Sequence, residues 1–114
     1  MTRLLLGLCV IALGAGCARQ PGRYLFVVPE QLPSGAPSDP QRAELEGWLV
    51  ERAGGFTEIE GVRGGWRAPD GSVVTEGNRL YLVTVGEHPR RFRSEVRARV
   101  IEDFDQQEAY IERW

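Results

Sequence analysis

Side chains that could carry out chemistry are few and scattered in this sequence of 114 residues. The chain has one histidine, His88, and two cysteines, Cys9 and Cys17. Zinc sites need several His or Cys ligands at short spacing, and His88 has no cysteine beside it. His88 also precedes a proline where a helix should begin, which is typical of an exposed loop residue and not of a Ser-His-acid triad. We therefore expect no metal site, no cofactor and no catalytic residue.

Four other residues are candidates for a face that binds a ligand or a partner: Trp66, Arg67, Glu76 and Glu108. Each also has an ordinary structural interpretation. Trp66 would be an aromatic residue packed against other apolar side chains. Arg67 and Glu76 would each form an ion pair with another residue. Glu108 would be a charge on an edge strand, where it discourages edge-to-edge aggregation.

The charge composition excludes one class of partner. The 14 basic residues are all arginines, and they are interleaved with 16 acidic residues. A nucleic-acid-binding face requires a stripe or patch of basic residues, and none is visible in the sequence. We therefore expect no nucleic acid partner.

The first residues are typical of a secretory signal. Arg3 is followed by the apolar residues 4–13 and then by small residues up to Gly16. One positive charge, a short apolar run and a small-residue exit form the usual layout of such a signal. The run is far shorter than the roughly 20 residues that a membrane span requires. Residues 1–16 are therefore predicted to be a signal peptide.

The exit from this segment, Leu13-Gly14-Ala15-Gly16-Cys17, resembles a bacterial lipobox. The resemblance implies that the Cys17 thiol is acylated and becomes the mature N-terminus, so that residues 17–23 form a lipid-anchored tether. Because Ala18 follows the cysteine, it also implies the outer membrane in a Gram-negative cell. The alternative is ordinary cleavage after Ala18, since Gly16-Cys17-Ala18 fits a small-x-small site, and a secreted or periplasmic protein would result.

The elements that must position the candidate residues can be read from periodicity and turn signals. An apolar strand at 24–28 precedes a proline-rich loop, and Asp39-Pro40 opens a helix with Asp39 as N-cap that ends at Gly54-Gly55. Trp48 on that helix is predicted to anchor the core against the sheet. The remaining expected elements are a weak edge strand at 56–62, a hairpin, a strand at 79–85, a helix from His88-Pro89 and a strand at 108–114. In the second helix, apolar residues recur at i, i+4, i+8 and i+12, and opposite charges lie four apart at Arg91–Glu95, Glu95–Arg99 and Arg99–Asp103.

The hairpin has a turn with a clear mechanism, Ala68-Pro69-Asp70-Gly71-Ser72. Proline suits the second turn position, and glycine accepts a positive φ. A three-residue loop would pair Trp66 with Val74 and Gly64 with Glu76. Alternation then places Trp66 and Glu76 on one face and Arg67 on the other. We expect the strand to break or bulge at residues 77–78.

The order strand, helix, strand, strand, helix, strand predicts a ferredoxin-like α+β domain at residues 24–114, with an antiparallel sheet and two helices on one face. The strands at 24–28 and 80–85 are apolar on both faces and should be central. The second sheet face should therefore be covered as well, by a homodimer through the sheet, by a ligand or by a flap made from the Trp66 hairpin.

The chain resembles a bacterial family of small secreted proteins of unknown function at Gly65-Trp66-Arg67, Pro69-Asp70-Gly71, Val73-Val74, Glu76, Leu80-Leu82 and Gln107-Glu108-Ala109-Tyr110-Ile111. That family has a G-x-W-R strand, a D-G turn, a strand with Glu, and a late Q-E pair. The resemblance implies no activity. The sequence as a whole predicts an envelope lipoprotein that serves as a non-catalytic binding or structural module. The alternative is a small-molecule enzyme on a dimeric α+β barrel, with Glu76 or Arg67 in a pocket on the open sheet face.

Overall fold

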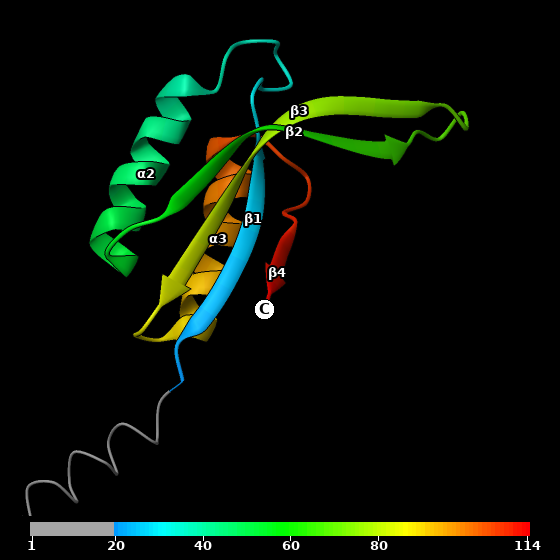
Figure 1. Cartoon of the computed structure of the whole chain (residues 1–114). Coiled ribbons are helices and arrows are strands. Elements are labelled where there is room, and N and C mark those ends of the chain that lie inside the picture. Colours follow the sequence, from blue (N-terminus) through cyan, green and yellow to red (C-terminus); the bar gives the residue numbers. More distant parts are fainter. Residues whose placement is uncertain (1–19) are drawn as a thin grey trace, which may run out of the picture.

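The computed structural model describes residues 20–114, so the predicted signal peptide and Cys17 lie outside the described part. The elements follow the predicted order (Figure 1). They are β1 (Gly22–Pro29), α2 (Asp39–Ala53), β2 (Thr57–Arg67), β3 (Val73–Val85), α3 (Pro89–Asp103) and β4 (Ile111–Arg113). None of the described helices is long and apolar enough to cross a membrane.

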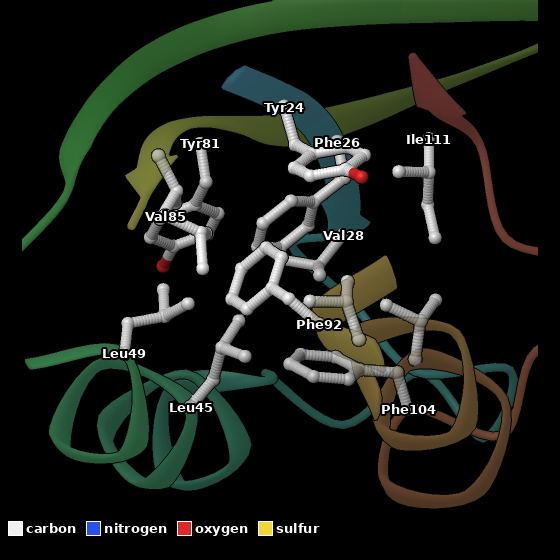
Figure 2. Close-up of a cluster of buried hydrophobic side chains, with 13 residues drawn as sticks. Tyr24, Phe26, Val28, Leu45, Leu49, Tyr81, Val85, Phe92, Phe104 and Ile111 are labelled. Carbon is white, nitrogen blue, oxygen red and sulfur yellow. The ribbon is translucent and has the colours of Figure 1, made fainter. Parts of the chain in front are cut away.

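The four strands form one antiparallel sheet in the order β2-β3-β1-β4. Both helices pack on the same face of this sheet (Figures 1 and 2). The fold is therefore ferredoxin-like, as the sequence predicts, and β1 and β3 are the central strands.

The core lies between the sheet and the two helices (Figure 2). Residues on β1 alternate, so that Tyr24, Phe26 and Val28 point toward the helices and are almost completely buried. Tyr81 of β3 lies opposite Phe26, and their rings stack at a centroid distance of 5.4 Å. The buried residues of α2, Leu45 and Leu49, and those of α3 form the opposite side of the core. Burying each large apolar side chain contributes about 1.5–3 kcal/mol to folding, so this layer is the main source of stability.

Helix α2 begins one residue earlier than predicted. Ser38, and not Asp39, is the N-cap residue, and its side chain caps no helix N–H group. The Ser38 hydroxyl instead donates to the carbonyl oxygen of Pro29 at 2.6 Å, which joins the helix start to the end of β1. The predicted helix end is confirmed, because Gly54 adopts a φ of 86° and its N–H donates to the Val50 oxygen.

Helix α3 has the apolar stripe that the sequence predicts. Its four members are fully buried or nearly so: Phe92, Val96, Val100 and Phe104. Of the three predicted ion pairs within the helix, the described structure forms the one between Arg99 and Asp103, at 3.8 Å. Glu95 instead pairs with Arg52 of α2 at 2.9 Å, because the two helices lie side by side on the sheet.

Trp48 packs against the core, as predicted, at the contact between the two helices. Its ring stacks on Phe92 at a centroid distance of 5.6 Å. The guanidinium of Arg99 lies 4.4 Å from the centroid of the Trp48 ring, which is a cation–π geometry. This partly buried tryptophan therefore ties α2 to α3.

The hairpin strands are longer and more continuous than expected. The predicted strand at 56–62 and the first hairpin strand together make β2, and β3 runs unbroken through Gly77 and Asn78. The irregularity lies on β2 instead, where the pairs Ile59–Leu80 and Val62–Asn78 leave one extra residue. Gly61 in this bulge has a φ of 70°, a conformation that glycine adopts without strain.

Strand β4 is shorter than predicted. It spans three residues, Ile111–Arg113, and pairs with β1. Glu108 therefore lies in the segment before the strand, and its predicted role as a charge on an edge strand is wrong.

Candidate functional site

The face of the sheet that points away from the helices carries aliphatic side chains on its two central strands. The residues of β1 that alternate with the core residues are Leu25 and Val27, and both are half-buried. They pair with Leu82 and Leu80 of β3, respectively, in the antiparallel register. Paired residues in such a ladder point to the same face, so these four side chains form one apolar patch.

The patch extends toward both edges of the sheet. On β2, Ile59 pairs with Leu80 and is 41% exposed. On the other side, the N–H of Trp114 donates to the Arg23 oxygen, which continues the β4 ladder by one residue. Alternation places Trp114, which is 62% exposed, on the same face as Glu112 and its partner Leu25. The term open face is used below for these six residues: Leu25, Val27, Ile59, Leu80, Leu82 and Trp114.

The hairpin does not cover the open face. The distal parts of β2 and β3 project away from the body of the domain (Figure 1). Trp66 on this hairpin is 53% exposed. The predicted intramolecular flap is therefore wrong, because the two strands continue outward beyond the sheet and do not fold back over it.

A broad cleft lies where the hairpin leaves the sheet, and its volume is about 1250 Å³. One wall comes from the hairpin, with Trp66 and Glu76. The other walls come from the segments 30–33, after β1, and 105–108, after α3. Three chain segments far apart in the sequence therefore meet at this cleft.

The structure brings three of the four candidate residues together. Trp66, Glu76 and Glu108 all line the cleft. The predicted pairing of Trp66 with Val74 and of Gly64 with Glu76 is confirmed, which puts Trp66 and Glu76 on one face of the hairpin. Arg67 is on the other face, and its guanidinium donates to the Gly71 oxygen at 2.8 Å, so it supports the turn.

The cleft is acidic. Four carboxylates line it, from Glu30, Glu76, Asp105 and Glu108, and its lining residues include no basic side chain. An aromatic ring beside carboxylates suits a cationic group or a hydrogen-bond donor better than an anion. Because Arg67 lies outside the cleft, the part of the enzyme alternative that relies on Arg67 to bind an anion there has no geometric support.

A partly buried polar network at the base of the hairpin was not predicted from the sequence. The hydroxyl of Tyr81 donates to Glu46 of α2 at 2.7 Å and lies 3.2 Å from a carboxylate oxygen of Glu58. Arg79 contacts Glu58 at 3.1 Å and Glu60 at 3.2 Å. Burial, together with the adjacent Glu46 carboxylate, raises the pKa of Tyr81 well above its ordinary value.

This network holds the start of the hairpin against α2 and the sheet. It joins residues on β2, β3 and α2, which the sequence places far apart. Glu58 lies opposite Tyr81 because the bulge on β2 shifts the register by one residue, and Glu46 comes from a helix whose position depends on the tertiary fold. The predicted register of the hairpin therefore did not reveal this network.

No protein-family model matches the chain, and no curated protein matches it. Solved structures do match. The divalent cation tolerance protein Cut A1 of Thermus thermophilus superposes with a TM-score of 0.60 at 22% identity, over 83% of this chain and 82% of that protein. CutA of Xylella fastidiosa superposes with a TM-score of 0.56 at 14% identity, over 81% of each chain. This chain shares their fold.

At these identities the similarity concerns the fold and not the function. Within residues 20–114, no three His, Cys, Asp or Glu side chains are grouped so that they could hold a metal ion. The resemblance of the G-x-W-R and Q-E residues to a secreted family stays a prediction.

Proposed function

We propose that this protein is a lipid-anchored protein of the cell envelope, and that it acts as a non-catalytic binding or structural module whose open face binds a second copy of the chain. The single observation that carries this proposal is the aliphatic open face. The lipid anchor is supported by the lipobox-like sequence that ends at Cys17.

The open face differs from an ordinary solvated sheet face. Antiparallel sheets with one face in water usually alternate between apolar and polar residues. Here the solvent side of β1 and β3 carries Leu25, Val27, Leu80 and Leu82, at the centre of the sheet. Contiguous apolar patches of this kind mark sites of protein association.

The charged residues beside the open face, as well as its apolar residues, are complementary to a second copy of the same face. Arg23 and Glu112 are exposed and lie beside the aliphatic patch, with side chains on the same face by alternation. In a two-fold arrangement the same surface meets itself, so Arg23 of one copy can approach Glu112 of the other. Two such sheets pack about 10 Å apart, which brings the aliphatic side chains into contact.

The cleft with Trp66 adds a further contact site to the proposal. Tryptophan is among the residues that contribute most binding energy at interfaces, because it buries a large area at low entropic cost. Trp66 is on the projecting hairpin and is 53% exposed at the cleft, so a second molecule can contact it there. We assign it the role of a partner-binding residue, with Glu76 and Glu108 as polar contacts around it.

The anchor half of the proposal is tested by the fate of Cys17. In the full-length chain, Cys17→Ala should abolish incorporation of labelled palmitate and move the protein from the membrane to the soluble fraction. Cys9→Ala is the matched control, because Cys9 lies in the segment that would be removed. The Cys9→Ala protein should incorporate as much labelled palmitate as wild type. Membrane attachment that survives Cys17→Ala would contradict the anchor, whereas a wild-type protein that is soluble, unlabelled and begins at Arg19 would favour cleavage after Ala18.

The self-association half is tested by a charge on the open face. Ile59→Glu should convert an oligomer to a monomer in sedimentation velocity, because the interface would have to bury a carboxylate among aliphatic side chains without a partner charge. Val50→Glu on α2 is the matched control, since Val50 is a 52% exposed aliphatic residue away from this face. A wild-type protein that is monomeric at all accessible concentrations would contradict the proposal.

A further inference from the structure

We propose that a basic surface formed by α3 and the neighbouring strand β4 docks on anionic phospholipid headgroups, so that the protein lies on the membrane helix-side down. The inference rests on the proposed lipid anchor and adds an orientation to it. The surface consists of five arginines, called the basic surface below: Arg90, Arg91, Arg93, Arg97 and Arg113.

The chain enters the domain beside this surface. Gly22, the first residue of β1, packs so closely on Pro89 that an added Cβ would lie 2.5 Å from the Pro89 Cβ. The hydroxyl of Tyr24 donates to the Pro89 oxygen at 2.9 Å. Figure 1 shows the start of β1 and the start of α3 at the same end of the domain. From Cys17 to Gly22 a fully extended tether reaches about 18 Å at most. An acyl group on Cys17 would therefore hold the start of α3 close to the headgroups.

The five arginines are available to an external anion. All five are exposed, and within residues 20–114 none of them forms an ion pair. Arg93 makes a 3.5 Å hydrogen bond to the Ile111 oxygen, and the Arg113 guanidinium lies 5.9 Å from the centroid of the Tyr24 ring. Both contacts leave the positive charge unneutralised.

Acidic groups near the basic surface do not cancel it. Glu95, in the N-terminal half of α3, is engaged by Arg52 at 2.9 Å. Glu87 is exposed just before the helix and is the other carboxylate in that segment. A chain with a net charge of −2 thus presents a locally positive surface where its N-terminus enters. Such juxtamembrane basic residues are attracted to anionic lipids within about a Debye length.

The charge distribution along α3 runs against helix stability. The first turn has no acidic residue and the last turn no basic one. The helix dipole favours the opposite arrangement, with acids at the N-terminus and bases at the C-terminus. A local preference that is broken without a compensating contact is expected at functional positions. Membrane docking supplies the missing anions.

This orientation is compatible with self-association. Helix α3 lies on the face of the sheet opposite the open face (Figure 2). Docking through α3 therefore leaves the open face free for a second copy, and the hairpin extends away from the end at which the chain enters (Figure 1). A lipid surface is favoured over a soluble acidic partner because the tether already places the basic surface at the bilayer.

The test places a fluorescent label at two serines of the acylated mature protein, in Ser94→Cys on α3 and in Ser72→Cys at the hairpin turn. Both serines are exposed. The protein is reconstituted in phosphatidylcholine vesicles with or without 30% phosphatidylglycerol, together with a headgroup-linked quencher. We expect quenching of the label in Ser94→Cys in the anionic vesicles, little quenching in Ser72→Cys, and loss of the effect at high salt.

The arginines are tested by a charge-matched pair of variants. Arg90→Gln/Arg97→Gln should lower the ratio of docked to undocked protein by about fivefold for each arginine removed. The control Arg63→Gln/Arg67→Gln removes the same charge from the hairpin and should change it less than twofold. Equal quenching of the Ser94→Cys label in both vesicle types would overturn the proposal, as would an equal loss of docking in both double variants. Binding of the protein to soluble polyglutamate with the same affinity as to the anionic vesicles would also overturn it.

Failure of the anchor is separable from failure of docking. Mass spectrometry of the mature protein reports directly whether Cys17 is acylated. If it is not, the unacylated protein is added to the same vesicles and sedimented. Binding that requires phosphatidylglycerol and is lost in Arg90→Gln/Arg97→Gln would support docking without the anchor, and absence of such binding would overturn it.

Discussion

Tyr81 links three parts of the molecule through one hydroxyl group. It lies in the core, opposite Phe26, yet its oxygen reaches Glu46 on α2 at 2.7 Å. A buried donor without a partner would cost about 1–3 kcal/mol, so the carboxylate is what allows a tyrosine at this position. The pKa of Tyr81 is raised first by burial and second by the Glu46 carboxylate, since both disfavour the phenolate.

The raised pKa of Tyr81 predicts a loss of stability at alkaline pH. An unfolded tyrosine ionises near pH 10, whereas the fold retains the neutral hydroxyl. The stabilisation is therefore complete below about pH 10 and falls above it, by at most about 1.4 kcal/mol per pH unit. In Tyr81→Phe, the free energy of unfolding should fall less between pH 8 and pH 11, as measured by denaturant titration.

Tyr110→Phe is the control for this experiment, because Tyr110 is 57% exposed. Its stability should follow the wild-type dependence on pH. At pH 8, Tyr81→Phe should be less stable by about 1 kcal/mol, since Glu46 loses its donor. Parallel curves for wild type and Tyr81→Phe would contradict the assignment of the alkaline loss to Tyr81.

Gly47 in helix α2 and Gly71 in the hairpin turn differ in backbone conformation. Gly47 lies in the exposed middle of α2 with nothing within 4 Å of an added Cβ. Gly71 lies in the hairpin turn at a φ of 90°, which residues with a Cβ adopt only at a cost. Both positions have open space, so the backbone conformation alone distinguishes them.

We therefore expect the same substitution to have opposite effects at the two positions. Gly47→Ala should stabilise the protein by about 0.5–1 kcal/mol, because alanine has the higher helix propensity. Gly71→Ala should destabilise it by about 1–2 kcal/mol through the left-handed conformation. Chemical denaturation of both variants measures the difference, and a shift of the same sign in both would show that these local terms do not dominate.

At the scale of the whole molecule, three surfaces point in different directions. The open face lies on one side of the sheet, the basic surface of α3 on the other, and the hairpin extends outward from the end opposite the chain entry (Figure 1). Such a domain can contact a membrane and a second copy at the same time. The acidic cleft lies between the hairpin and the segments 30–33 and 105–108 of the domain body.

Self-association through the open face predicts a thermal midpoint that depends on protein concentration. Association that stabilises the folded state shifts unfolding by mass action. The midpoint of wild type should rise over a hundredfold range of concentration, as followed by calorimetry, while that of Ile59→Glu should stay constant and that of Val50→Glu should follow wild type. A wild-type midpoint that does not change with concentration would argue against the second copy.

Much of this fold is determined by local sequence. Two continuous apolar runs become the central strands, and the four-residue apolar repeat of α3 becomes buried, because burial follows periodicity directly. The turn at Pro69-Asp70-Gly71 sets the register of the hairpin, since proline and glycine restrict the local backbone. That register is why the common face of Trp66 and Glu76 could be predicted.

The tertiary structure alone decided the features that join distant segments. Three such features depend on how the elements pack: the hydrogen bond from Ser38 to Pro29, the position of Glu108 outside β4, and the presence of Glu108 and Trp66 in the lining of the same cleft. The projection of the hairpin away from the sheet is also a feature that only the tertiary structure decided. Apolar residues on both faces of β1 predict that both faces are covered, but a pattern in one strand contains no information on which segment or molecule covers them. That depends on the path of β2 and β3, and their path leads away from the sheet (Figure 1).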